Sequence, residues 1–302
     1  MPLYVADSFL GWMDNWRRVA ARNVRDLVED PKNALLKTAD NMGETLIKHF
    51  QDPMNFVGAG IAGTLIGSSS KLWNKAAADK ASKLLEEKAL PAEVWKKTGT
   101  FRSPGDSLLR QEIPDIEAAL IGDIHKRARR PLTEILDHPK LFEAYPELTK
   151  VEVVTGPQVK GGSFTKGSRG SPDNIGLGTN DTFFPIERLM HEVQHAVQEI
   201  EGFQPGANTF LVKSLPEYKE GLGKVIEKQA LKDSSNWTSV DSSDLDTTLQ
   251  LLADSIYRRT AGEAEARAVA DRVFESKASL KKTIPTMSYD VPISSLIRQE
   301  LK

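Results

Sequence analysis

The sequence predicts an α+β fold that is mainly helical, with a small sheet and a helical N-terminal arm. Apolar residues recur at helical spacing over long stretches of the chain, which favours helices. Two short runs, residues 150–154 and 174–178, read as strands, and the first alternates charged residues with β-branched valine. The composition shifts near Pro91, so we place the helical arm over residues 1–90 and a separate domain over residues 91–302.

Length and composition are those of an ordinary globular chain. Its 302 residues suffice for one large domain or two modest ones. The net charge of −2 gives no general attraction to nucleic acid or to anionic membranes, so we expect no nucleic-acid partner. The chain has no cysteine, so a metal site would need histidine and carboxylate ligands, which are typical of catalytic rather than structural zinc.

The N-terminal arm begins with two predicted helices separated by Asp30-Pro31. Residues 7–28 place apolar side chains near one face and arginines mostly off it, and residues 32–50 form the second helix. We interpret the first helix as packing on the rest of the protein or on a partner, with contact to a membrane surface as the alternative. The chain start lacks the features of a secretory signal, and the apolar run at residues 56–66 is too short to span a bilayer, so we expect synthesis in the cytosol.

A glycine-rich stretch, Gly58-Ala59-Gly60-Ile61-Ala62-Gly63, formally matches a dinucleotide-binding fingerprint. We reject that interpretation because no strand precedes the stretch and no βαβ unit follows it. Instead, we interpret residues 56–67 as a helix whose small residues allow close helix–helix contact. A further helix is predicted over residues 71–89, which are rich in strong helix formers.

The elements of the second domain follow in order. Residues 95–115 are loop-rich, and residues 138–148 read as a helix that a proline ends. Residues 156–170 are rich in glycine and lysine, which predicts a hairpin or a loop. Helices are expected over residues 215–232 and 245–276, with a polar loop between them.

One stretch carries recognisable chemistry, the His-Glu-x-x-His motif formed by His191, Glu192 and His195. Residues four apart on a helix share a face, so the two histidines can point at one ion. Glu192 lies one step around the helix, where it can reach a water and act as a general base. The motif therefore predicts a zinc ion bound by His191 and His195, with Glu192 as the catalytic residue.

The surroundings of the motif argue against the alternative of an ordinary surface pair of histidines. The helix that carries it has an apolar stripe, so it should be substantially buried; the stripe consists of Leu189, Met190, Val193, Val197 and Ile200. Pro185 suits the first turn of this helix, and Gly202 is placed to end it. Asp181 or Thr182 would cap its N-terminus. A polar cluster on a buried helix needs a reason, which a bound metal supplies.

A catalytic zinc ion usually has three protein ligands and one open position. The segment 257–267 is the candidate source of the third ligand, because Glu263 and Glu265 are flanked there by alanines on a predicted helix. Small neighbours would let this helix pack closely on the motif helix, so that one carboxylate reaches the ion. The alternative is that both glutamates form a solvated face and pair with nearby arginines.

Several motifs occur together in a characteristic order. These are His-Glu-x-Gln-His-Ala-x-Gln at 191–198, Glu201-Gly202-Phe203, and Gly-Glu-x-Glu-Ala-Arg at 262–267, with outlying landmarks Trp95-Lys96-Lys97-Thr98-Gly99, Glu112-Ile113-Pro114-Asp115, His138-Pro139, Tyr145-Pro146 and Asp290-Val291-Pro292. In this order they resemble the zincin-like metallopeptidase domain of bacteriophages, which often lies within large polyvalent proteins. The resemblance covers about residues 85–300 and leaves out the N-terminal helices.

The resemblance implies a zincin-like metallopeptidase domain with a zinc cofactor. It implies that His191, His195 and an acid of the Gly-Glu-x-Glu-Ala-Arg stretch are the metal ligands. Related zincins place the ligand glutamate three residues before the alanine, which selects Glu263, with Glu265 as the second choice. Glu192 matches the general base of the family.

The resemblance also implies a reaction and a setting. The reaction is hydrolysis of a peptide bond in a protein or peptide substrate, and Tyr257 and Tyr218 are candidates to contact the oxyanion. A phage-encoded enzyme would be made in the host cytoplasm and would then act there or in the virion. The alternative hypothesis is a virion structural or ejected internal protein. In it the zincin-like domain is an assembly or peptide-binding module, and the N-terminal helices contact copies of the chain or other virion proteins.

Overall fold

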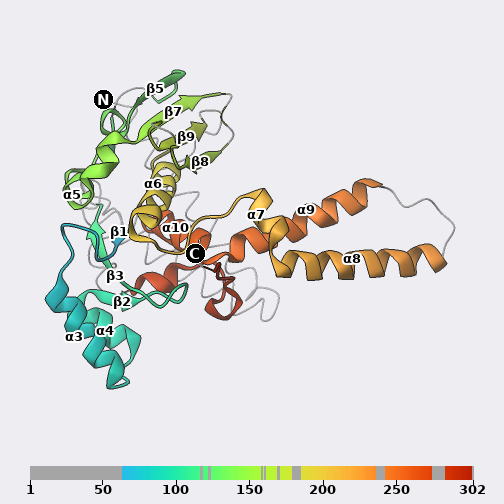
Figure 1. Cartoon of the computed structure of the whole chain (residues 1–302), viewed down its shortest axis with the longest axis horizontal. Helices are drawn as coiled ribbons and strands as arrows, with labels where there is room; N and C mark the ends of the chain where they lie inside the picture. The colour runs from blue at the N-terminus through green and yellow to red at the C-terminus, as the bar shows by residue number, and fades with distance from the viewer. Residues whose placement is uncertain are drawn as a thin grey trace, which may run out of the picture. The chain divides into compact units, whose positions relative to one another are not determined.

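The computed structural model describes residues 63–115, 118–121, 124–157, 159, 161–168, 171–178, 185–235, 242–273 and 283–300. These residues form a mixed α+β fold, which confirms the predicted α+β class, although the structure has three small sheets where one was expected (Figure 1). The two helices predicted over residues 7–50 lie outside the described residues, as do the predicted caps Asp181 and Thr182. No helix within the described ranges is long and apolar enough to cross a membrane.

The first sheet has three antiparallel strands, with β3 (Leu109–Pro114) between β1 (Gly63–Ile66) and β2 (Thr100–Arg102). Our prediction of a helix over residues 56–67 was wrong in its described part, because β1 is a fully buried strand. Two of its four residues are β-branched, and pairing with β3 favours the extended backbone. Gly63 permits the close approach, since a Cβ atom there would stand 1.8 Å from Cγ of Glu112.

The two helices that follow β1 in the chain lie on either side of the domain boundary that we predicted at residue 90. α3 (Lys75–Glu86) begins at Asn74, whose side chain accepts a hydrogen bond from the amide of Ala77. It packs against α4 (Pro91–Thr98) and against β2. Residues on both sides of Pro91 therefore pack together, and the boundary that we placed at residue 90 does not coincide with a break in packing among the described residues.

A second, two-stranded sheet pairs β4 (Ala119–Leu120) with β6 (Leu136–Asp137), which follows the 3-10 turn η2 (Leu132–Glu134). α5 (Pro139–Ala144) comes next, capped by the His138 ring, which accepts a hydrogen bond from the amide of Leu141. The chain then turns into η3 (Pro146–Lys150). The helix predicted over residues 138–148 is thus shorter than expected, but it ends before the proline as predicted.

The third sheet has the strand order β5, β7, β9, β8. Its central strands β7 (Glu152–Gly156) and β9 (Asn174–Gly178) run parallel, which confirms the two predicted strands. β5 (Ala128–Pro131) forms one edge and β8 (Gly162–Thr165) the other, both antiparallel to their neighbours. β8 lies in the stretch predicted as a hairpin or loop, and it contacts the motif helix.

The motif helix is α6 (Pro185–Glu201), and its ends agree with the prediction, since Gly202 follows its last residue with a φ of 67°. α7 (Thr209–Ser214) and α8 (Pro216–Ser235) come next. The 3-10 turns η4 (Pro285–Ser288) and η5 (Ile293–Ser295) belong to the C-terminal segment.

Our prediction of a single helix over residues 245–276 was wrong. The structure has two helices there, α9 (Ser242–Arg259) and α10 (Ala261–Arg272). Thr260 separates them with an extended backbone. The cause is a pairing with the C-terminal segment: the amide of Ile297 donates to the carbonyl of Arg259, and its carbonyl accepts from the amide of Ala261. The break gives α10 its own direction, and α10 packs along α6.

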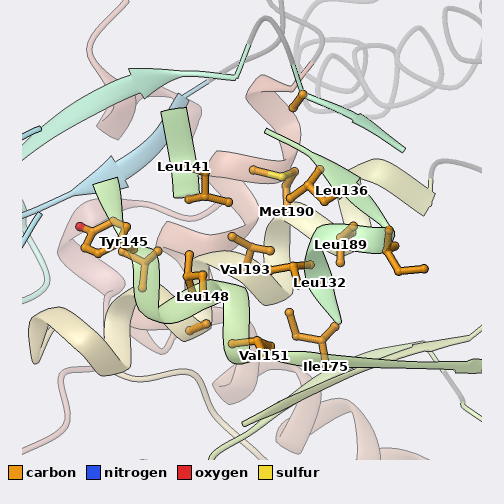
Figure 2. Packing of buried hydrophobic residues seen from close by; sticks show 14 of the residues in the cluster. Leu132, Leu136, Leu141, Tyr145, Leu148, Val151, Ile175, Leu189, Met190 and Val193 are labelled. Carbon is orange, nitrogen blue, oxygen red and sulfur yellow. The ribbon is translucent and has the colours of Figure 1, made fainter. Parts of the chain in front are cut away.

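The largest hydrophobic cluster lies under the apolar stripe of α6 (Figure 2). Leu189, Met190 and Val193 are completely buried there, against residues of the second and third sheets such as Leu136 and Ile175. Each large side chain buried in this way contributes roughly 1.5–3 kcal/mol. The helix is therefore fixed along one face, and its opposite face carries the two histidines.

Candidate metal site

The two histidines of α6 face each other closely. Nε2 of His195 lies 3.0 Å from Nε2 of His191, and the ring centroids are 4.6 Å apart with nearly perpendicular planes. Helical spacing produces this arrangement, since side chains four residues apart stand one above the other. His195 is buried and His191 is 16% exposed, so the pair lies at the edge of the interior.

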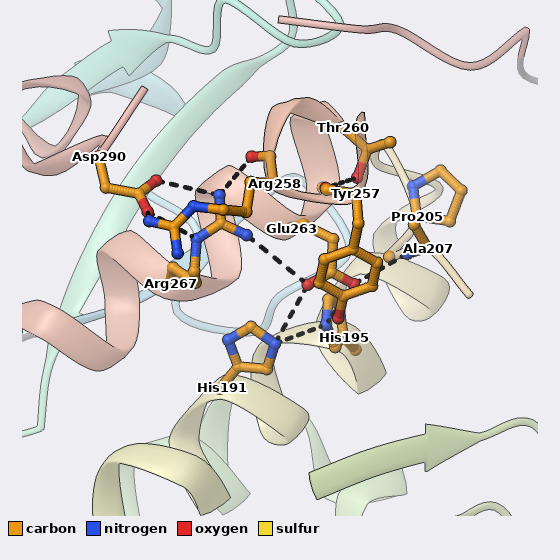
Figure 3. A network of polar contacts seen from close by, with 12 residues as sticks. His191, His195, Pro205, Ala207, Tyr257, Arg258, Thr260, Glu263, Arg267 and Asp290 are labelled. Atoms are coloured by element: carbon orange, nitrogen blue, oxygen red, sulfur yellow. Dashed lines mark hydrogen bonds and ion pairs between the residues drawn. The ribbon is translucent and has the colours of Figure 1, made fainter. Parts of the chain in front are cut away.

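Glu263, in the first turn of α10, completes the cluster. Its Oε2 lies 3.4 Å from Nε2 of His191 and its Oε1 lies 3.4 Å from Nε2 of His195. One ligand atom from each of the three residues lies within 4.8 Å of the others, so the group could hold a metal ion. Figure 3 shows the two imidazoles and the carboxylate turned toward one another.

The donor set fits a cation at its centre. Glu263 is 1% exposed, and its Oε1 accepts a hydrogen bond of 2.8 Å from the amide of Ala207. Oε2 is also buried but makes no hydrogen bond within the described part of the chain. A buried carboxylate oxygen without a donor is costly. Two imidazole nitrogens and one carboxylate are also the protein ligands of a common class of catalytic zinc site.

The charges of the cluster are coupled. Burial alone would raise the pKa of Glu263, but the neighbouring imidazoles of His191 and His195 hold it well below the ordinary value. Burial lowers the pKa of His191. Burial would lower the pKa of His195 too, but the Glu263 carboxylate outweighs it and raises that pKa. The site therefore holds an ionised carboxylate against imidazoles, which is the charge pattern that a cation would satisfy.

The catalytic candidate Glu192 is 5% exposed and lies against the edge strand β8. The amide of Phe164 donates a hydrogen bond to its carboxylate. A Cβ atom on Gly162 would stand 2.3 Å from Oε1 of Glu192, so only glycine fits there without displacing it. Burial raises the pKa of Glu192 to about 7, with the Glu263 charge acting in the same direction.

The structure separates the two glutamates proposed as third ligand. Glu265 is buried but points away from the histidines, toward Gln198, Ser103 and Arg110. The two acids are two positions apart on α10, which places them roughly 200° apart around the helix. Glu263 is therefore the acid that meets the histidines, and neither glutamate forms a solvated face.

The two tyrosine candidates differ in location. Tyr257, at the end of α9, lies beside Glu263 (Figure 3), and burial followed by the Glu263 charge raises its pKa. Tyr218 is buried inside a hydrophobic cluster with residues such as Val212 and Ile256, and Tyr257 packs against the same cluster from its edge. Of the two, only Tyr257 is positioned to reach a group bound at the site.

Sequence reasoning gave no role to three residues that contact the cluster. Gln198 contacts His195, Arg267 lies 4.0 Å from Glu263, and Gly206 packs against the His195 ring. Gln198 had a usable signal, since it follows His195 by three positions on the same helix. Arg267 had the same kind of signal, since it follows Glu263 by four positions on α10. Gly206 had none, because tertiary packing alone brings it to His195.

No protein-family model matches the sequence, and neither the curated proteins nor the solved structures give a match.

Proposed function

We propose that the chain is a zinc metallopeptidase with a zincin-like domain, as the sequence resemblance implies. The observation that carries this proposal is the meeting of both motif histidines with Glu263 from a separate helix. His191, His195 and Glu263 would hold the zinc ion. When bound, zinc would supply a Lewis acid that polarises a carbonyl group and lowers the pKa of a water to about 7.

Glu192 has the role of general base in this proposal. It neighbours the cluster without belonging to it, so its carboxylate is free to take a proton from the attacking water. The same carboxyl group would then deliver that proton to the leaving amine. Tyr257 would donate a hydrogen bond to the oxyanion that develops on the substrate carbonyl.

β8 offers a way to align an extended peptide. It is an edge strand, and the amide of Phe164 points away from β9, toward Glu192. Alternate residues of a strand present their backbone groups to the same side, so Gly162 faces the same way. A peptide paired along this edge would run past the general base, which is the geometry of β-strand addition.

The test measures metal content in the wild-type protein and in His191→Ala and Glu263→Ala. About one zinc per chain in the wild type, lost in both variants, is expected, and Glu199→Ala serves as a control on the exposed side of α6. Glu192→Gln should keep its zinc and lose peptide hydrolysis. A wild-type protein that takes up no zinc would contradict the proposal and favour the virion-assembly hypothesis.

A further inference from the structure

Gln198 lies on α6 one turn after His195 and is almost completely buried at 1% exposure. Its Oε1 lies 2.8 Å from Nδ1 of His195. Its Nε2 donates to the carbonyl oxygen of Gly262 at 2.9 Å and contacts Oε1 of Glu265 at 3.3 Å. One amide thus contacts a motif histidine on one side and the start of α10 on the other.

The surroundings of the amide fix its orientation. The carbonyl of Gly262 can only accept a hydrogen bond, and the Glu265 carboxylate beside it pairs with Arg110, whose Nε lies 3.4 Å away. If the amide were rotated by half a turn, its oxygen would face two acceptors and lose both contacts. The nitrogen of Gln198 therefore faces α10, and its oxygen faces His195.

This orientation determines where His195 carries its proton. The oxygen of Gln198 can only accept, so the short contact requires a proton on Nδ1 of His195. A neutral imidazole has one N–H group, so Nε2 then presents a lone pair. That lone pair faces His191 and Glu263, at 3.0 and 3.4 Å.

We infer that Gln198 is the positioning residue of the metal site: it holds His195 in the tautomer with the proton on Nδ1 and ties that ring to the helix that carries Glu263. This inference deepens the proposed function and rests on it for the metal. Partners of this kind orient metal ligands generally, and their loss typically lowers metal affinity about 10- to 100-fold.

A buried glutamine that merely joins two helices would have no effect on the tautomer. α6 offers a matched control in Gln194, which is completely buried and whose amide bonds both to the amide and to the carbonyl of Leu65. Gln194→Leu removes two buried backbone contacts without touching either histidine. Gln198→Leu removes the equivalent contacts together with the acceptor for His195.

The first measurement is the ring-nitrogen NMR spectrum of the metal-free protein, labelled at its five histidines, at alkaline pH where the rings are neutral. We expect His195 to carry its proton on Nδ1 in the wild type and in Gln194→Leu, and to lose that preference in Gln198→Leu. A wild-type His195 with the proton on Nε2 would overturn the inference without any variant. The inference can therefore be tested even if Gln198→Leu does not fold.

The second measurement is zinc affinity by competition with a chromophoric chelator. Gln198→Leu should bind zinc about 10- to 100-fold more weakly, and Gln194→Leu should bind as the wild type does. If both variants lost the same amount of zinc affinity, Gln198 would have a structural role only. If the wild type showed the expected tautomer but took up no zinc, the proposed function would fail while the positioning of His195 by Gln198 would stand.

Discussion

Gly206 lies so close to His195 that a Cβ atom on it would stand 2.6 Å from Cε1 of the ring and 3.0 Å from Oε1 of Glu263. The loop between α6 and α7 is therefore pressed against two of the three candidate ligands, and the next residue, Ala207, donates its amide to Glu263. Glycine is needed here for space, because a methyl group would displace either the ring or the loop.

Gly206→Ala should accordingly damage the metal site more than the fold. We expect zinc affinity to fall at least about tenfold, since the ligands must shift, while the free energy of unfolding falls by about 1–3 kcal/mol, as for other overpacked sites. Chelator competition and urea unfolding measure the two quantities. Gly223→Ala on α8 is the control, because a Cβ atom there would meet nothing within 4 Å outside its own stretch of helix. Unchanged zinc binding in Gly206→Ala would show that the loop yields freely.

Gly162 in β8 is crowded in the same way as Gly206, but it lies against the general-base candidate Glu192 and not against the metal-ligand candidates. Gly162→Ala should displace the Glu192 carboxylate, because the new methyl group would stand 2.3 Å from its Oε1. We expect kcat to fall about 100-fold, as when a general base is misplaced, with zinc content unchanged. Kinetics on a peptide substrate, together with metal analysis, test this. A loss of zinc in Gly162→Ala would mean that the strand supports the ligands as well.

Tyr257→Phe separates binding from transition-state stabilisation. The ring remains and only the hydroxyl is lost, so zinc content and KM should stay near the wild-type values. We expect kcat to fall by about 10²–10³-fold if the hydroxyl contacts the oxyanion. Tyr218→Phe is the matched control, because it removes a hydroxyl from the interior of the hydrophobic cluster against which Tyr257 also packs. Equal kcat values for Tyr257→Phe and the wild type would remove Tyr257 from the mechanism.

The end of α6 is anchored by Glu201, which allows a prediction about stability alone. Its carboxylate accepts hydrogen bonds from the amides of Gly67, Ser69 and Ser70, at 2.9–3.1 Å, and from the hydroxyl of Tyr145. Glu201→Ala leaves these donors without their acceptor, and hydrogen bonds to charged groups contribute about 1.5–3 kcal/mol each. We expect a loss of about 2–4 kcal/mol in urea unfolding, with unchanged zinc content per folded chain. Glu199→Ala, which removes an exposed carboxylate two residues away, should change stability by less than about 0.5 kcal/mol.

The parts of the fold that could be predicted are those that local signals determine. Pro185 and Gly202 bound α6 because each acts on its own backbone, and helical spacing alone brings His191 and His195 together. What could not be predicted depends on distant pairing. Thr260 breaks the expected long helix only because Ile297 bonds to the residues on either side of it.

The same distinction applies to the acids of the site. The sequence places Glu263 and Glu265 on one helix, but which acid faces α6 depends on how that helix packs. The break at Thr260 sets the start of α10. Arg110 from β3 and Ser103, which directly follows β2, hold Glu265 on the far side. Burial of Glu265 also needs those partners, and the sequence alone does not reveal a pairing between residues so far apart.

Metal removal should lower the stability of the fold, because the ion would be held by residues of both α6 and α10. Zinc that binds the native site alone stabilises it by RT ln(1 + [L]/Kd), which is about 2.7 kcal/mol at a free concentration 100 times the Kd. The ion would join α6 to α10, so chelation should lower Tm, and added zinc should restore it. Glu263→Gln removes one ligand charge, and its Tm should respond far less to zinc than that of the wild type. A wild-type Tm that is the same with chelator and with zinc would show that His191, His195 and Glu263 hold no ion, and that Glu263 is balanced by the two histidines and Arg267 alone.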